Sequence, residues 1–403
     1  MHRARQLAWE LPDLGWDVDV LAPGVGFQRA DSIDGDSLPL FNPRTRVHAV
    51  APVADRWLRA LGIGNIGWRS LGPMLREGHR LIRERRHDLV YITTAQFPLF
   101  TLGPLWKARH GVPYVLDFHD PWVRQESGVA TRDYSIKRRL GGWAARILER
   151  RAVQGANGVV AVSPAYLDDL RNRYGALPAL SEGRTLAVPF GGLPAECAAP
   201  PPRLDRKHRE IVYVGAGGAL MRRSFETICR ALAQTDPVLR RDLRIRLYGT
   251  DSGWRAGAPK PLQDLAVRMG LGDLVEENPE RIPYTRALKL ARESDGLLVL
   301  GVDEPAYAPS KLLTYALTGL PLLACLRADS AAARIFRSSG SAGHLLGFGT
   351  AAESPAVPIV SRFLEEVRGG ARFDRTAGLQ SLLARGMAQR HAALFEHVLD
   401  APR

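Results

Sequence analysis

Short apolar runs alternate with amphipathic segments along most of the chain. Runs of apolar and β-branched residues bounded by turn residues predict strands at residues 16–21, 47–50, 88–93, 113–117 and 158–163. Apolar positions at helical spacing predict helices at residues 3–14, 97–109, 135–154 and 163–173, and in parts of 55–86. Apolar strands that alternate with helices predict a parallel sheet covered on both faces.

Prolines interrupt this rhythm at residues 194–209, which we interpret as a linker. Beyond it, strands are predicted at residues 211–214, 243–248, 296–300 and 321–325, and helices at 222–234, 262–269, 284–293 and 310–318. The pattern therefore predicts an α/β protein with two Rossmann-like doubly wound domains, at residues 1–193 and 210–370. Residues 371–403 contain a basic amphipathic helix, predicted at 376–399, which we expect to pack back on the first domain.

Composition and charge indicate which classes of partner the protein binds and in which cell compartment it works. The 403 residues carry a net charge of +13, and the excess is spread over both halves, whereas a nucleic-acid-binding domain more often concentrates it. Cys197, Cys229 and Cys325 lie too far apart for a CxxC motif, so we expect neither a disulfide framework nor a metal site. The sequence contains no run of about 18 apolar residues and no signal-like N-terminus. We expect a cytoplasmic protein that does not bind nucleic acid.

Several segments, in order and in register, resemble the family-4 (group 1, retaining) glycosyltransferases of bacteria. These enzymes have the GT-B fold, in which two Rossmann-like domains face each other across a cleft. The matching segments are residues 5–18, Asp117–Trp122, Ala161–Leu170, Val188–Gly192, Tyr213–Gly215, 281–299 and Pro309–Pro321. The resemblance implies transfer of a sugar from a nucleotide-sugar donor, bound mainly by the second domain, to an acceptor on the first. It implies no cofactor beyond the nucleotide sugar as co-substrate.

Residues expected to bind the donor follow two strands of the second domain. The loop Gly215-Ala216-Gly217-Gly218 lets backbone approach a ligand closely, although it is not the G-x-G-x-x-G fingerprint. Arg222 and Arg223 follow, and the resemblance places diphosphate-clamping cations near there. Ser310 can cap a helix whose N-terminus suits a diphosphate, and Lys311 adds a charge. A tight turn and solvated helix starts are the structural alternatives.

One motif of the family departs from its usual form. The glutamates of the E-x7-E pattern would fall at residues 306 and 314, which are Ala306 and Thr314 here. Thr314 would offer the ribose a neutral hydrogen bond in place of a carboxylate. Glu304, or the neighbouring Asp303, is a candidate to replace the other glutamate near the sugar.

His119 and Asp120 follow a predicted strand at the end where sites form in α/β proteins. His119 is a candidate base, or a group that polarises the leaving group. Asp120 could orient His119 or bind an acceptor hydroxyl, and the alternative is that it only caps a turn before Pro121. A retaining front-face transfer needs no protein nucleophile, because the donor phosphate can accept the acceptor proton.

The segment 55–86 is rich in arginine, with tryptophans and leucines interleaved. Such basic amphipathic segments can lie in an anionic membrane interface, so we expect peripheral contact with the inner face of the cell membrane; a solvated helix is the alternative. The fold of the resembling enzymes begins with a strand and a glycine-rich loop, whereas this sequence starts within the helix that follows. We therefore expect that the first strand of the N-terminal domain is missing.

The leading interpretation is a glycosyltransferase of envelope polysaccharide, glycolipid or natural-product assembly. A catalytically impaired scaffold or binding protein of the same fold is the main alternative, favoured by Thr314 and Ala306. A nucleotide-sugar epimerase is a further one.

Overall fold

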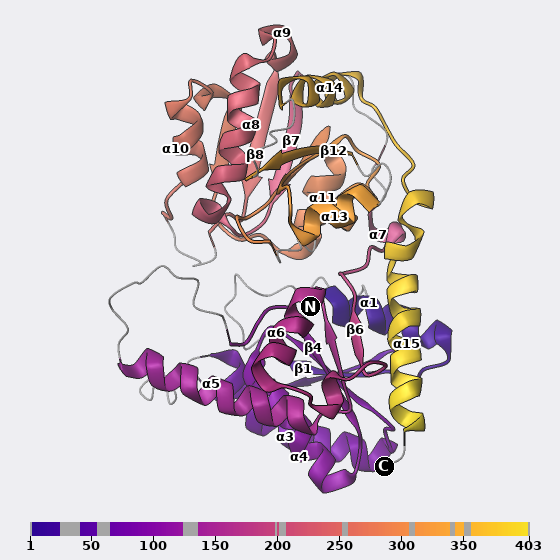
Figure 1. The fold of residues 1–403 in the computed structure, drawn as a ribbon. Helices are drawn as coiled ribbons and strands as arrows, with labels where there is room; N and C mark the ends of the chain where they lie inside the picture. Colours follow the sequence, from indigo (N-terminus) through magenta and orange to yellow (C-terminus); the bar gives the residue numbers. More distant parts are fainter. Residues whose placement is uncertain are drawn as a thin grey trace. The chain divides into compact units, whose positions relative to one another are not determined.

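The computed structural model describes residues 2–24, 41–54, 65–123, 136–197, 200, 207–251, 257–305, 311–338, 343–349 and 356–401. These residues form two compact units, coloured by sequence in Figure 1. Among the described residues, unit 1 comprises those up to Phe190 together with those from Arg385 onward, and unit 2 comprises those between them. The chain therefore leaves unit 1 after Phe190 and returns to it after Ala384.

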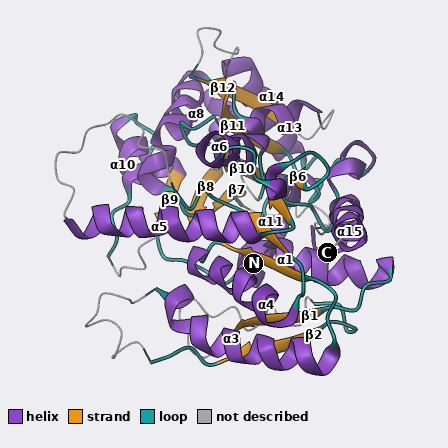
Figure 2. Ribbon diagram, turned by 60° about the horizontal axis from the view of Figure 1, so that its bottom comes forward, coloured by secondary structure: helices purple, strands orange, loops and turns teal. Residues whose placement is uncertain are grey.

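Unit 1 contains six parallel strands in two sheets, ordered β1-β2 and β3-β4-β5-β6. The strands are β1 (Asp19–Pro23), β2 (Arg46–Val50), β3 (Val90–Thr94), β4 (Tyr114–Phe118), β5 (Gly158–Ala161) and β6 (Thr185–Ala187). The helices are α1 (His2–Glu10), α3 (Ile66–Arg85), α4 (Leu102–His110), α5 (Ile136–Gly155), α6 (Pro164–Tyr174) and α15 (Ala384–Asp400), with 3-10 helices at Leu11–Leu14, Phe97–Thr101 and Pro178–Leu180. Figure 2 shows α3 running beside β1 and β2.

Strand β4 explains how unit 1 is layered. All five of its residues are buried, and they alternate between the two faces of the sheet. Tyr114, Leu116 and Phe118 face a core shared with α3, α4 and α5. Val115 faces the opposite core, which α1 and α15 complete through residues such as Leu7 and Phe395. The C-terminal helix is thus part of the core of unit 1.

Unit 2 contains one six-stranded parallel sheet, ordered β12-β11-β10-β7-β8-β9. The strands are β7 (Arg209–Val214), β8 (Leu243–Tyr248), β9 (Val275–Asn278), β10 (Gly296–Leu300), β11 (Leu322–Arg327) and β12 (His344–Phe348). The helices are α7 (Pro194–Cys197), α8 (Arg222–Gln234), α9 (Pro237–Arg240), α10 (Pro261–Arg268), α11 (Tyr284–Glu293), α12 (Leu312–Ala316), α13 (Ala331–Ser338) and α14 (Ala356–Gly369), with 3-10 helices at Gly218–Met221, Gly272–Leu274 and Ala377–Leu382.

Alternation along β7 divides the core of unit 2 into two layers. Ile211 and Tyr213 pack with α8, α10 and α14, whereas Val212 and Val214 pack on the opposite side with α11, α12 and α13. Helix α8 supplies buried residues at helical spacing, including Phe225, Ile228, Cys229 and Leu232. The predicted doubly wound α/β architecture is confirmed.

The predicted helix at 376–399 is wrong in one respect, because two helices meet there. A 3-10 helix ends at Leu382, Leu383 is extended, and α15 starts at Ala384. Leu383 is extended because it pairs in parallel with Gly192, and the Ala384 N–H donates to the Gly192 carbonyl at 2.8 Å. A Cβ on Gly191 would lie 2.7 Å from the Ala384 Cα, so this close pairing requires glycine.

Candidate functional site

A buried polar cluster lies at the carboxyl end of β4 in unit 1. The His119 Nε2 lies 2.7 Å from the Asp117 Oδ2 and 2.9 Å from the Thr93 Oγ1, and the Thr93 hydroxyl donates to the same Asp117 oxygen at 2.7 Å. The side chain of His119 is 8% exposed and that of Asp117 is fully buried. Because β3 and β4 are parallel neighbours, Thr93 and Asp117 lie opposite each other in register.

Arg3 of α1 supplies the charge that balances Asp117. Its Nε lies 3.3 Å from the Asp117 Oδ2, and both side chains are fully buried. Burial alone would raise the pKa of Asp117, but the charges of Arg3 and His119 and the hydrogen bonds from His119 and Thr93 lower it overall. Asp117 is therefore a carboxylate at neutral pH.

Asp117 is a residue that the sequence analysis missed as a site residue, because it reads as the last position of an apolar strand. It is the carboxylate that contacts the His119 ring at hydrogen-bond distance. Asp120, named from the sequence, is exposed one residue beyond His119. A charged residue in an otherwise apolar buried strand is the signal that could have identified Asp117.

In unit 2, a glycine loop joins β7 to α8. The loop glycines Gly217 and Gly218 adopt φ angles of +151° and +34°, which other residues rarely adopt. A Cβ on Gly217 would meet the Met221 side chain at 2.4 Å, and one on Gly218 would lie 3.0 Å from the Thr250 carbonyl oxygen. Gly217 and Gly218 are therefore restricted to glycine by conformation, and Gly218 also by space.

Lys311 lies against this loop. Its Nζ is 5.3 Å from the centre of the Tyr213 ring, and a Cβ on Gly215 would come within 1.7 Å of that Nζ. Burial, together with the nearby charge of Arg281, lowers the pKa of Lys311 to about 8. The structure thus brings together Gly215 and Lys311, two residues that are 96 positions apart and were predicted separately.

The remaining candidates of unit 2 are less closely grouped. Arg223 forms an ion pair with Asp303 at 2.5 Å, and Asp303 also contacts Arg327 at 2.6 Å. Arg222 and Glu304 are exposed. Thr314 is half-buried in α12, and Ser310 and Ala306 lie outside the described residues.

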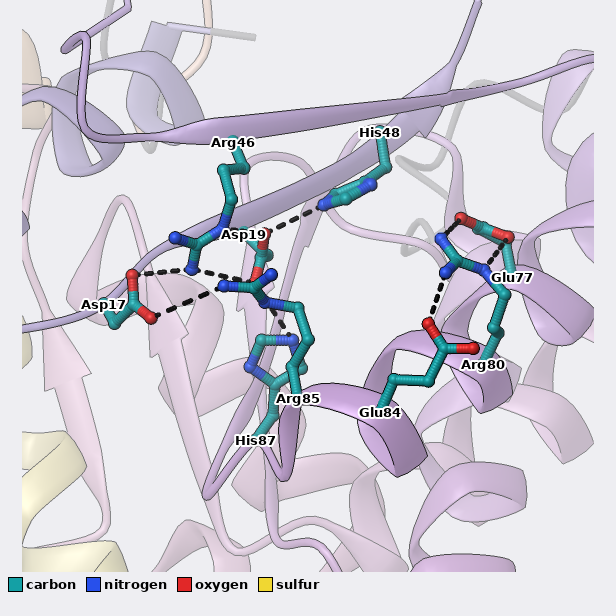
Figure 3. Close-up of polar contacts among 9 residues, drawn as sticks. All are labelled: Asp17, Asp19, Arg46, His48, Glu77, Arg80, Glu84, Arg85 and His87. Atoms are coloured by element: carbon teal, nitrogen blue, oxygen red, sulfur yellow. Dashed lines mark hydrogen bonds and ion pairs between the residues drawn. The ribbon is translucent and has the colours of Figure 1, made fainter.

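A second polar cluster occupies the amino end of β1 in unit 1 (Figure 3). The Asp19 carboxylate, 4% exposed, contacts Arg46, His48, Arg85 and His87 at 2.8 to 3.2 Å. Burial would raise the pKa of Asp19, but hydrogen bonds from Arg46 and His48 lower it to about 2. The cluster ties β1 and β2 to the end of α3. We interpret it as structural, because sites in parallel sheets form at the opposite, carboxyl ends of the strands.

Among the residues that the structure describes, no group of three or more His, Cys, Asp or Glu residues could hold a metal ion. None of the helices in this part of the chain is long and apolar enough to cross a membrane.

Residues 2–191 match the model of the glycosyl transferase 4-like domain. The match covers 190 of the 403 residues, a little less than half of the chain. A D-inositol 3-phosphate glycosyltransferase of Streptosporangium roseum is 30% identical over 183 residues, which are 44% of this chain. The match spans 41% of that relative, less than half its length.

Solved structures with the GT-B fold are similar to this protein over nearly its whole length. The sucrose-phosphate synthase of Thermosynechococcus elongatus matches with a TM-score of 0.62 at 16% identity, covering 99% of this chain and 93% of its own. The HepE protein of Anabaena in complex with UDP and glucose matches with a TM-score of 0.60 at 15% identity, covering 94% and 99%. An α,α-trehalose-phosphate synthase of Burkholderia xenovorans matches at 0.58 and 12%, covering 96% and 100%. The predicted GT-B architecture is confirmed.

Proposed function

We propose that this glycosyltransferase moves a sugar from a nucleotide-sugar donor to an acceptor hydroxyl, with retention of anomeric configuration. The observation that carries the proposal is the Lys311 ammonium held against the Gly215 loop at the carboxyl end of β7. A half-buried cation beside backbone that a ligand can approach closely suits a donor diphosphate. The nucleotide sugar is the co-substrate, and no metal or further cofactor takes part.

The roles follow the positions of the residues. Lys311 neutralises the charge of the diphosphate. The backbone of Gly215, Gly217 and Gly218 lines the diphosphate, and Arg222 is exposed at the start of α8. Arg223 is held by Asp303, so we assign it to positioning of the loop at the strand ends. We also assign Ser310, Thr314 and Glu304 to binding of the donor.

The reaction balances without a protein nucleophile. The bond between the anomeric carbon and the diphosphate oxygen breaks while the acceptor oxygen bonds to the same carbon. The acceptor proton passes to the departing diphosphate, and the nucleoside diphosphate is released. In unit 1, His119 and Asp120 bind hydroxyl groups of the sugars.

The similar proteins suggest the first substrates to test. The HepE structure holds UDP and glucose, so UDP-glucose is the first donor. The name of the Streptosporangium roseum relative suggests a phosphorylated polyol as one class of acceptor.

A thermal-shift panel of UDP-glucose, UDP-galactose, UDP-N-acetylglucosamine and GDP-mannose tests donor binding. We expect at least one nucleotide sugar to raise the melting temperature, and Lys311→Ala to remove the shift. Lys289→Ala, which changes an exposed lysine on α11, is the control and keeps the shift. No shift with any donor would support the scaffold alternative, which Thr314 favours by replacing a glutamate. The anomeric configuration of the product, measured by proton NMR, tests retention.

We further propose a cytoplasmic enzyme that works at the inner face of the membrane in envelope polysaccharide or glycolipid assembly. Residues 55–64 of the predicted basic segment lie outside the described residues, but α3 covers the remainder. Trp68 is 41% exposed on α3, and Arg76, Arg83 and Arg86 are exposed along it or just after it. Arg80 and Arg85 are instead engaged by carboxylates (Figure 3). A helix face with an exposed tryptophan and several exposed arginines can bind a membrane surface that contains anionic lipid.

Co-sedimentation with vesicles tests this contact. Vesicles containing anionic phosphatidylglycerol should bind the protein, neutral phosphatidylcholine vesicles should not, and 0.5 M salt should release it. Changing Arg76 and Arg83 to Glu should abolish binding. Equal binding of this double variant would refute the assignment to α3.

A further inference from the structure

The His119 cluster continues through the core of unit 1 to the C-terminal helix. The Arg3 Nη1 lies 3.4 Å from the Nε2 of His391 on α15, and the Arg3 Nη2 donates to the Val188 carbonyl at 2.7 Å. The Tyr91 hydroxyl lies 3.2 Å from the same His391 nitrogen. A continuous set of contacts thus joins α15, α1 and the strand ends at β3 and β4.

The chemistry of the partners fixes where the hydrogens lie around His391. Its Nδ1 is 2.7 Å from the Met387 carbonyl oxygen, which can only accept, so Nδ1 carries the hydrogen. Burial and the charge of Arg3 lower the pKa of His391 to about 4, so the ring is neutral and the single lone pair of its Nε2 faces the Arg3 Nη1 and the Tyr91 hydroxyl. The Arg3 guanidinium is therefore held on two sides, with its Nε facing Asp117 at 3.3 Å.

The same reasoning applies to His119. Asp117 is an ionised carboxylate and can only accept, so the His119 Nε2 donates to it and carries a hydrogen. The ring is also held by Phe190, whose ring meets it edge-to-face at 5.1 Å and lies 5.2 Å from the Arg3 guanidinium carbon. His119 Nδ1 is the ring nitrogen that neither Asp117 nor Thr93 contacts.

We propose that Arg3 and Asp117 are positioning residues, which hold His119 in the Nε2–H form so that Nδ1 accepts a hydrogen bond from a substrate hydroxyl. This inference rests on the role of His119 in the proposed function. Arg3 keeps Asp117 ionised, Asp117 fixes the ring, and α15 fixes Arg3. The C-terminal helix therefore contributes to the geometry of the site without contacting substrate.

NMR of protein labelled with ¹⁵N at the histidine rings tests the tautomer directly, without any substrate. The His119 signals are identified as those lost in His119→Gln. At a pH where this ring is neutral, we expect Nε2 to be protonated and Nδ1 not. Asp117→Asn, whose amide can donate, should remove this preference. A protonated Nδ1 in the wild type, or an unchanged tautomer in Asp117→Asn, would overturn the proposal.

Kinetics with the donor selected by the thermal-shift panel test the consequence. We expect Asp117→Asn to lower kcat about 100-fold, the loss expected when a group that positions substrate is misplaced, with the donor KM nearly unchanged. In a double-mutant cycle, Asp117→Asn should have little further effect once His119 is Gln. Asp168→Asn makes the same change at a 63% exposed carboxylate of unit 1 and should leave kcat unchanged.

Arg3 provides a second route if Asp117→Asn lowers the folded fraction. Arg3→Gln should lower kcat and weaken the tautomer preference, and Arg3→Lys, which restores the charge, should recover most of both. If His119→Gln retains full activity, the proposed role of His119 fails. If His119→Gln is inactive while Asp117→Asn and Arg3→Gln remain fully active, only the positioning inference fails.

Discussion

Lys311→Met should make the free protein more stable and at the same time weaken nucleotide-sugar binding. Burial lowers the pKa of Lys311 from 10.5 to about 8. This difference corresponds to about 3 kcal/mol, at 1.36 kcal/mol per pKa unit. Because the folded pKa lies below the unfolded one, the cost is full below pH 8 and fades as the pH rises to 10.5. Contact between the ammonium and the Tyr213 ring offsets about 0.5–2 kcal/mol.

The net expectation at pH 7 is a gain of about 1–3 kcal/mol in the free energy of unfolding for Lys311→Met, measured by urea denaturation of the free protein. A bound diphosphate favours the charged ammonium, so binding above pH 8 takes up a proton. The Kd for UDP-glucose should therefore rise about tenfold between pH 7 and pH 9 in the wild type.

Isothermal titration calorimetry in two buffers of different ionisation enthalpy measures both the Kd and the proton uptake. At pH 8, about half a proton should be taken up per nucleotide sugar bound. Lys289→Met, at an exposed lysine, should keep the pH dependence. A Kd that is flat from pH 7 to pH 9, or a free Lys311→Met protein that is less stable than the wild type, would refute the assignment of the ammonium to the diphosphate.

Three further changes test other parts of the structure. Gly215→Ala should displace the flexible lysine tip, which a Cβ would approach to 1.7 Å, and weaken donor binding about tenfold or more with little change in melting temperature. The buried His391, with a pKa of about 4, must be protonated on unfolding in acid, so the wild type should lose about 2 kcal/mol of stability between pH 7 and pH 5 that His391→Gln does not lose, measured by urea denaturation. Gly78→Ala should cost about 1–3 kcal/mol, because a Cβ would lie 2.3 Å from an indole ring on α4. Gly142→Ala, at an exposed and open position of α5, should stabilise by about 0.5–1 kcal/mol, and equal melting temperatures of the two variants would contradict the packing argument.

The fold could be predicted from periodicity because its strands are apolar and its helices have clear apolar faces. The bounds predicted for α8, β8 and α11 agree with the structure. Strands β6, β9 and β12 and helices α13 and α14 were not predicted. Strand β9, Val275–Asn278, alternates between buried and exposed positions and carries two glutamates, so its sequence does not differ from that of a polar loop.

The candidate site was only partly accessible to sequence reasoning. The glycine loop and Lys311 were found because each belongs to a local motif. The contacts of Arg3 with Asp117 and His391 were not found, since they join residues 114 and 388 positions apart. No local sequence pattern indicates a contact between residues so far apart in the chain. An arginine three residues from the start of a sequence is typical of an exposed terminus, and its complete burial follows only from the packing of α1 against β4 and α15.

The return of the chain to unit 1 after Ala384 has a consequence for synthesis on the ribosome. Met387, Phe395 and Val398 of α15 pack with Val115 and Val160 in one core layer of unit 1. All of unit 2 must be translated before these residues emerge from the ribosome. Until then the apolar face of unit 1 that α15 covers is exposed, although unit 2 can already fold. The usual N-terminal-first order of domain folding is therefore reversed. Until α15 is made, the nascent first unit exposes this apolar face and is prone to aggregate.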